Sequence, residues 1–408
     1  MAANPLRPIA VLYRDAFGGL PALTWVLCAA GFINRCGSMV VPFLSLYLKK
    51  EFDYSAAQAG GFLSAYGAGA FAGSWLGGWL TDRYGPVRTQ ICTLAATGVW
   101  MLGMTQIRDP WLLAVSVFVL GVLNDAFRPG SLTAVAISCE PALRRKALSL
   151  NRLAMNAGWA FGPTIGGYLT MVDFRLMFVA DGGTCALAAL WLLVCLRHWN
   201  PAPPPREADD ARHGQPLLDR HFLCLMAANL AVLIAFMQYF TTGTRFLEEH
   251  GGYSKSEIGW FLAINPVMIM LFEMPTVHLL RYRAALPLVA RGAAIVGLGY
   301  LCLLLPIGAF AVVIAMVVVA AGELLQMPML GAYVNDRAPP HARGAYNGAY
   351  GMTFCAGLVL APLLGGALYD AAGPEALWWS CGAFGLAACI GFALLHRGEH
   401  SRCARGRL

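Results

Sequence analysis

Residues 158–167 read GWAFGPTIGG, and residues 357–366, which lie 199 positions later, read GLVLAPLLGG. The two stretches have the same glycine at the first position, the same proline at the sixth and the same glycine pair at the end. Each lies inside a long apolar run. Small residues at every fourth position let two helix backbones approach closely in a membrane. The two stretches therefore predict a pair of equivalent membrane helices.

The same offset of 199 also relates other parts of the chain. Residues that match at this offset are Tyr54 and Tyr253, Ser55 and Ser254, Gly60 and Gly259, Pro129 and Pro328, and Arg144 and Arg343. Matches at one offset across several helices indicate two sequence-related halves. Because each half holds an even number of spans, the halves are expected to be parallel repeats with the same orientation.

The composition of the whole chain predicts a membrane protein. Of its 408 residues, 58% are hydrophobic and 12% are charged, and the mean hydropathy is +0.59. So few charges could not cover the surface of a soluble protein, and the composition also excludes disorder. Apolar runs of about 20 residues are long enough to cross a bilayer, and in lipid they must be helices. The predicted spans are 22–48, 56–80, 89–107, 111–138, 148–171, 175–197, 220–247, 256–280, 286–306, 310–334, 345–369 and 374–396.

The sequence therefore predicts an all-α membrane protein with twelve transmembrane helices in two parallel six-helix repeats. The first bundle is assigned to residues 1–197 and the second to residues 220–408. Residues 198–219 are polar and proline-rich, which is typical of a linker, here a cytoplasmic one. Two such halves enclose a central cavity, and rocking them exposes the cavity to each side in turn.

The net charge of +7 is explained by topology and requires no nucleic acid partner. Most of the 29 Lys and Arg residues lie in loops on the same side as the N-terminus, or in the C-terminal tail. The positive-inside rule then places both termini in the cytoplasm, with the basic loops near anionic lipid. No cleavage site precedes the first span, so no cleavable signal peptide is expected. We expect a monomeric, multi-pass protein of the cell membrane, here a bacterial inner membrane.

The turn between the second and third predicted spans carries a motif. Residues 78–88 read GWLTDRYGPVR, which resembles the cytoplasmic signature G-x-L-A-D-R-x-G-R-[RK] of the major facilitator superfamily. Gly78 is expected to let its helix approach a neighbour closely, and Gly85 to permit a tight turn. Asp82 is expected to latch the two halves on the cytoplasmic side. The motif residues are Gly78, Asp82, Arg83, Gly85 and Arg88.

The fifth predicted span adds to this resemblance. Its GxxxGPxxGG pattern is similar to one common among the drug–proton antiporters of that superfamily, and the resemblance implies that it seals the extracellular side and favours export. The fourth span departs from the family, because Val117 occupies the position of the usual arginine. The motif residues of the fifth span are Gly158, Gly162, Pro163, Gly166 and Gly167.

Ionisable residues inside the predicted spans are the candidates for function. A charge at the bilayer centre costs at least about 2.5–3.5 kcal/mol on insertion scales, so it must face a cavity or a partner. Asp125 and Arg128 are three residues apart on one helix and are expected to pair. For Asp181 and Arg152, near helix ends, a structural ion pair or hydrogen bond between helices is the favoured interpretation. Candidates for proton coupling or for the substrate cavity are Arg35, Asn34, Asp125, Arg128, Asp181, Glu273, Glu323 and Gln326.

Glu323 is the first candidate for a proton site or a site for a cationic substrate, and Asp125 is the second. Glu323 lies near the middle of its span and is equivalent to Asn124 at the 199 offset, so both halves point polar groups at one place. Burial favours the protonated form of a carboxyl group, which can then take up and release protons. A structural hydrogen bond or ion pair between helices is the alternative for each residue.

The sequence predicts a secondary transporter and not an enzyme. It contains no GxxxxGK[ST] motif, so ATP is not expected to drive transport, and no catalytic motif, metal-ligand cluster or cofactor site is recognisable. The favoured function is proton-coupled efflux of small amphipathic compounds, with a small-molecule substrate, protons and the lipid bilayer as partners. A proton symporter that imports a small metabolite such as a peptide or sugar is the alternative. A membrane receptor or scaffold without transport is the third hypothesis.

Overall fold

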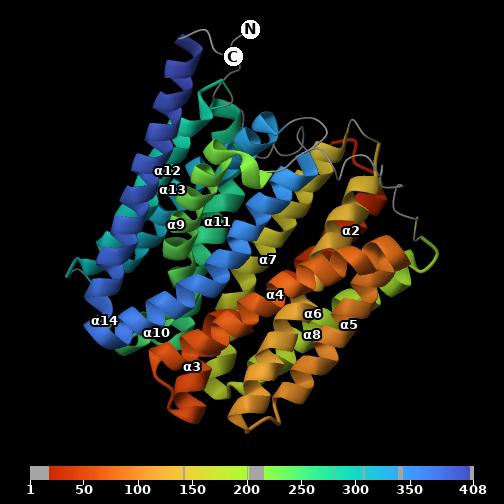
Figure 1. Cartoon of the computed structure of the whole chain (residues 1–408). Coiled ribbons are helices and arrows are strands. Elements are labelled where there is room, and N and C mark those ends of the chain that lie inside the picture. The colour runs from red at the N-terminus through yellow and green to blue at the C-terminus, as the bar shows by residue number, and fades with distance from the viewer. Residues whose placement is uncertain are drawn as a thin grey trace.

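The computed structural model describes residues 18–140, 143–199, 201, 216–280, 282–306, 308–338 and 343–404 (Figure 1). Most of the predicted linker, residues 198–219, lies outside these ranges. The first half contains α2 (Ala22–Cys36), α3 (Val40–Phe52), α4 (Ala56–Tyr84), α5 (Pro86–Met104), α6 (Pro110–Ile137), α7 (Arg144–Val172) and α8 (Arg175–Leu196). The second half contains η2 (Pro216–Leu218), α9 (Arg220–Met237), η3 (Gln238–Phe240), α10 (Thr242–Glu249), α11 (Lys255–Leu280), α12 (Ala285–Leu301), η4 (Cys302–Leu304), α13 (Ala309–Arg337) and α14 (Arg343–Ala404).

The predicted number of spans is confirmed. Within the described ranges, eight helical stretches are long and apolar enough to cross a membrane. One of them, Tyr346–Gly398, contains two spans of α14 that meet at Gly373, whose φ of 81° and ψ of 175° are not helical. The more polar or glycine-rich α4, α5 and α7 supply three further spans. Pro374, which follows Gly373, begins the last span, because a proline has no amide hydrogen to donate to the preceding turn.

The sequence predicts one continuous helix for the first span of each half, whereas the structure has two shorter helices there. The first breaks at residues 37–39 and the second at residues 238–241, so at the offset of 199 the two breaks adjoin and share the position of Met39 and Gln238. In the first half, Pro42 explains the break, because its missing amide hydrogen and its ring prevent α2 from continuing past Ser38. In the second half the break leaves Thr241, the equivalent of Pro42, at φ −115° and ψ −93°.

Figure 1 shows α3, α10 and the kink of α14 gathered at one end of the bundle. We call this end the far side. The opposite end, where α4 and α8 finish and α9 begins, we call the linker side.

A glycine stripe joins α4 to α6 inside the first half. A Cβ atom on Gly69, Gly73 or Gly77 would collide with the backbone of α6, at Phe118, Val122 and Ala126 respectively. Gly78 is the exception, because a Cβ placed there would meet no atom within 4 Å. The prediction that Gly78 permits close helix approach is therefore wrong. One residue corresponds to about 100° of helix rotation, which turns Gly78 away from the contact made by Gly77.

The other motif residues of this turn are placed at the end of α4. Gly85 has a φ of 87°, so the tight turn that needs a glycine is confirmed. The Arg83 guanidinium lies 5.4 Å from the Trp79 ring centroid and 5.7 Å from that of Tyr84, so cation–π contacts hold it against the end of its own helix. The latching role of Asp82 stays a prediction.

On the linker side, Asp219 joins three helices of the second half. Its carboxylate caps α9 by accepting from the Phe222 amide at 3.1 Å, and accepts two hydrogen bonds of 2.9 Å from Arg337 of α13. The Tyr346 hydroxyl of α14 donates to it at 3.3 Å. Burial raises the pKa of Asp219, but the hydrogen bonds from Arg337 and Phe222 lower it more, so the net pKa lies below its usual value.

We expect Asp219→Ala to lower the free energy of unfolding by about 1–2 kcal/mol, because it removes a helix cap and an ion pair. The wild-type contribution is present above the unfolded-state pKa, about 3.9 for Asp, and is lost as pH falls through the lower folded-state pKa. The difference in the free energy of unfolding between the wild type and Asp219→Ala should therefore be constant from neutral pH to about pH 4 and shrink below it. Unfolding of purified protein at several pH values measures this, and Asp219→Asn, which keeps the cap, should lose less. Equal stability of all three proteins would contradict the assignment.

Candidate functional site

A pocket in the first half collects several of the predicted residues. Arg35 of α2, Tyr66 of α4, Asn124 of α6 and Asp181 of α8 line a small pocket. Arg35 lies near enough to Asp125 and Asp181 to act on both charges. Within the described ranges, however, its guanidinium makes no hydrogen bond and no ion pair. The pocket thus holds a cation without a fixed partner.

The predicted ion pair between Asp125 and Arg128 does not form. The two residues share a helical face, but no contact within 4 Å joins them, and Arg128 is exposed while Asp125 is half-buried. A long arginine side chain can carry its charge toward water and leave a shorter acid behind.

Asn34 faces away from the pocket that its neighbour Arg35 lines. It is buried, and its Nδ2 donates to the Cys185 sulfur of α8 at 3.4 Å. Asp181 is placed beside the break between α2 and α3, because a Cβ on Gly37 would lie 2.8 Å from its Oδ1. Asn34 therefore joins α2 to α8, whereas Asp181 faces the pocket.

In the second half, Glu323 of α13 is buried and bonded to a neighbouring helix. Its Oε2 accepts from Nδ2 of Asn265 of α11 at 2.9 Å. In the first half, Nδ2 of Asn124 donates to the Tyr66 hydroxyl at 2.7 Å. These two pairs are equivalent at the 199 offset, so each half joins the same two helices with one polar pair. Of the two pairs, only that of the second half contains an acid.

Gln326 does not line a cavity as predicted. It is fully buried, and its Nε2 donates to Oδ1 of Asn229 of α9 at 2.8 Å. Asn229 donates in turn to the Thr353 hydroxyl of α14 at 2.7 Å. Gln326 lies about one helical turn from Glu323 but points into the contact between α9, α13 and α14. It therefore ties helices of the second half together.

An ion pair joins the two halves near Glu323. The Arg152 guanidinium of α7 lies 3.0 Å from the Glu273 carboxylate of α11, and it also lies close enough to Glu323 to stabilise a negative charge there. Arg152 thus makes an ion pair between helices, and whether that pair is purely structural stays a prediction. Sequence reasoning missed that its partner belongs to the other half, because no local pattern links positions so far apart.

The residues of the fifth-span motif pack against two different parts of the protein, one in each half. Gly158, Gly162 and Gly166 face the end of α2 and the break that follows it, where a Cβ would press on Arg35, Ser38 and Met39. Pro163 and Gly167 instead lie against Gly259 and Lys255 of α11 in the other half. The motif thus holds α7 between its own half and the second one. Its role in sealing one side of the membrane stays a prediction.

The fold and these polar clusters define a polytopic membrane transporter: two six-helix repeats place charges where the halves meet, and such charges are costly in lipid unless they are used. The model of the Major Facilitator Superfamily matches residues 27–254 and 225–405. The chain belongs to this family, and it is a transporter and not an enzyme.

Two relatives are similar over most of their length. The uncharacterized MFS-type transporter YqjV of Bacillus subtilis (strain 168) is 24% identical over 341 residues, which cover 81% of this chain and 82% of the relative. The multidrug resistance protein MdtH of Enterobacter sp. (strain 638) is 25% identical over 324 residues, which cover 76% and 77%.

Solved structures share the fold at low sequence identity. A POT family transporter in complex with a thioalcohol-conjugated peptide has a TM-score of 0.80 at 15% identity and covers 96% of this chain and 99% of that one. A mutant of the nucleoside transporter NupG has a TM-score of 0.75 at 14% identity, with coverage of 91% and 99%.

Proposed function

We propose that this transporter exports small amphipathic compounds by alternating access and that proton entry drives the export. The observation that carries the proposal is the buried Glu323, bonded to Asn265 and placed beside the Arg152–Glu273 ion pair. Burial favours the neutral form of a carboxyl group, and a nearby arginine favours the charged form. A change in the distance between Arg152 and Glu323 would therefore load or release a proton.

The ion pair supplies a way to couple this change to movement. Arg152 and Glu323 belong to different halves, so rocking the halves alters their separation. While Glu273 pairs with Arg152, the Glu323 carboxyl group accepts a hydrogen bond from Asn265. When the halves move, Arg152 can leave Glu273 and pair with Glu323. Its positive charge then favours release of the proton from the Glu323 carboxyl group. Proton release is then tied to one conformation.

We place one part of the substrate site at the small pocket of the first half, which must widen when the halves move. The unpaired Arg35, the Tyr66–Asn124 pair and the ring of Trp159 line it, so a polar and an aromatic group can both be bound. The names of multidrug resistance relatives such as MdtH support export. We further propose that both termini lie in the cytoplasm of a bacterial inner membrane and that the protein acts as a monomer.

Import with protons is the second candidate. A zwitterion could be held between Arg35 of one half and Glu323 of the other, and a peptide-bound POT family transporter shares the fold. Proteoliposomes with an imposed proton gradient separate the two. In antiport, substrate and protons move in opposite directions, whereas in symport they move together. Absence of any flux across a panel of cationic, anionic and zwitterionic amphiphiles would contradict both.

Exchanging the charges of Arg152 and Glu273 distinguishes a coupling role of Arg152 from a purely structural one. We expect Arg152→Gln to reduce gradient-driven flux about tenfold, within the usual range of coupling between two sites. The double variant Arg152→Glu with Glu273→Arg restores an ion pair between α7 and α11 but moves the cation into the half that holds Glu323, so rocking no longer changes its distance from Glu323 and coupled flux should not be restored. Flux in proteoliposomes measures both variants. Full recovery in the double variant would show that Arg152 only holds the helices together.

A further inference from the structure

The contact between α7 and α11, which belong to different halves, is tight at one end and hollowed at the other. On the far side the two backbones touch, because a Cβ on Gly259 would collide with the Pro163 carbonyl and one on Gly167 with the Lys255 carbonyl. Toward the linker side the same two helices leave a small pocket between them. The residues that line it include Leu153 and Asn156 of α7 and Ile269, Met270, Glu273 and Met274 of α11. A ligand in this pocket would lie between the two halves.

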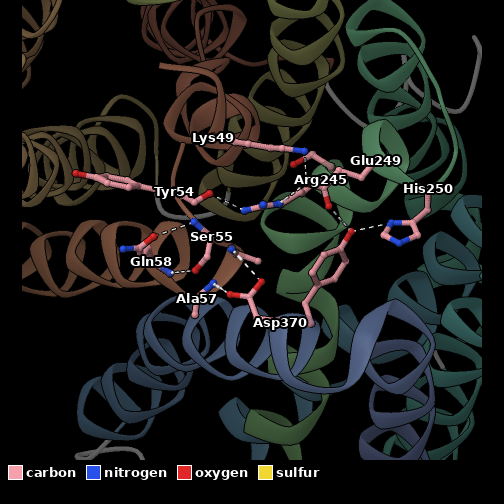
Figure 2. Close-up of polar contacts among 12 residues, drawn as sticks. Lys49, Tyr54, Ser55, Ala57, Gln58, Arg245, Glu249, His250 and Asp370 are labelled. Atoms are coloured by element: carbon pink, nitrogen blue, oxygen red, sulfur yellow. Dashed lines mark hydrogen bonds and ion pairs between the residues drawn. The ribbon is translucent and has the colours of Figure 1, made fainter. Parts of the chain in front are cut away.

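On the far side, polar contacts tie the halves together (Figure 2). Asp370 of α14 accepts from the Ala56 amide at 3.1 Å and from the Ala57 amide at 2.7 Å, both at the start of α4. Glu249 of α10 pairs with Lys49 of α3. These contacts all cross between the halves, so a ligand would reach the α7–α11 pocket of this conformation from the linker side.

The lining of the α7–α11 pocket combines apolar surface with a negative charge. Leu153, Ile269, Met270 and Met274 supply the apolar surface, and Glu273 is the acid among the described residues that line the pocket. Methionine side chains are flexible and polarizable, so they can move aside to widen the pocket and fit ligands of different shapes. This lining suits a ligand with an apolar body and a positive charge.

The acid of this pocket already has a partner, but one that can be displaced. The Arg152 guanidinium lies 3.0 Å from the Glu273 carboxylate, and the Arg152 side chain is 44% exposed whereas that of Glu273 is 15% exposed. An ion pair with so exposed a partner contributes little to stability, and a long arginine side chain can carry its charge toward water. A cationic amphiphile would also cover the apolar surface of the pocket, which favours it over Arg152 as the partner of Glu273.

We infer that the α7–α11 pocket binds cationic amphiphiles, whose positive charge replaces Arg152 at Glu273. Arg152 is then released to pair with Glu323, which is the step proposed above for proton release. The charges balance. Before binding, Arg152 neutralises Glu273 and the Glu323 carboxyl group carries a proton. Afterwards the ligand neutralises Glu273, Arg152 neutralises Glu323, and one proton has left for water on the linker side. The inference rests on the proposed export of amphipathic compounds and adds the charge of the substrate.

Isothermal titration calorimetry on the full chain in phosphatidylcholine nanodiscs, with empty nanodiscs subtracted, tests the site. The probe is phenylbutyltrimethylammonium, and the uncharged phenylbutanol, which has the same apolar body, is the comparison. The ammonium ion should bind about fivefold more tightly than the alcohol, a factor typical of one partly exposed charge pair. Equal binding of the two would overturn the inference.

Two variants should change the affinity for the ammonium ion in opposite directions. Glu273→Gln removes the acid and should weaken binding about fivefold. Arg152→Gln removes the competing cation and should strengthen binding by about the same factor, because Glu273 is then always available. Glu257→Gln, the same substitution at an exposed acid of α11, is the matched control and should leave the affinity unchanged. Thermal unfolding shows whether each variant is folded.

Two results with the variants would contradict the site. Unchanged affinity in folded Glu273→Gln would show that the acid does not bind the cation. Weaker binding in Arg152→Gln would show that the ion pair only holds the pocket in shape.

Proton release on binding separates this site from the proposed proton coupling. The quaternary ammonium ion carries no proton of its own, so the proton that an indicator dye reports in weakly buffered solution must come from the protein. Wild type should release about one proton for each ion bound, as the charge balance requires. Glu323→Gln should bind the ion and release none. Binding without proton release in wild type would refute the coupling proposed for Glu323, whereas the cation site would stand on the affinities.

Discussion

Glu323→Gln is expected to reduce gradient-driven flux about 100-fold, toward the upper end of measured coupling between sites. Glutamine keeps the size of the side chain and can still accept from Asn265, so the helix contact survives, but it cannot exchange a proton. The variant should therefore still bind substrate and exchange it down a substrate gradient, while an imposed proton gradient no longer drives net movement.

The measurement is flux in proteoliposomes with and without the proton gradient, together with proton movement reported by an internal dye. Glu375→Gln is the matched control, because Glu375 is an exposed acid on α14. Undiminished proton-coupled flux in Glu323→Gln would reject the role of this residue and favour Asp125, the second candidate. Loss of both coupled flux and substrate exchange would instead indicate that Glu323 binds substrate.

Gly77→Val is expected to prevent the first half from folding, whereas Gly78→Val should be tolerated. A Cβ on Gly77 collides with the Ala126 backbone of α6, which cannot move aside as a flexible side chain can. Overpacking usually costs about 1–3 kcal/mol, and a clash between two helix backbones lies at or above the upper end of that range. Next to it, a Cβ on Gly78 meets nothing within 4 Å.

The pair controls for helix propensity, because both variants place the same residue in the same helix. The yield of folded protein in membranes and the Tm after purification measure the difference. Equal loss in the two variants would show that the surroundings of α4, and not its contact with α6, decide the tolerance. The family motif begins at Gly78, but the structure places the close contact at Gly77.

The sequence by itself determined the number of spans, the two repeats and the family. Hydropathy is a local property, so a run such as 310–334 shows its span without any partner. The offset that matches Pro163 with Pro362 likewise needs no structure. The presence of a buried acid at Glu323 and of a cation at Arg35 could also be predicted, because charges inside apolar runs are rare and costly.

Only the tertiary structure decided which way each side chain points and what it meets. It separated Arg128 from Asp125, turned Gln326 toward Asn229 and joined Arg152 to Glu273. It also placed Asp370 at the start of α4, more than 300 residues earlier in the chain. The physical reason is that helix rotation depends on how all the neighbouring helices fit together. A polar contact between distant segments leaves no periodic signal in either of them.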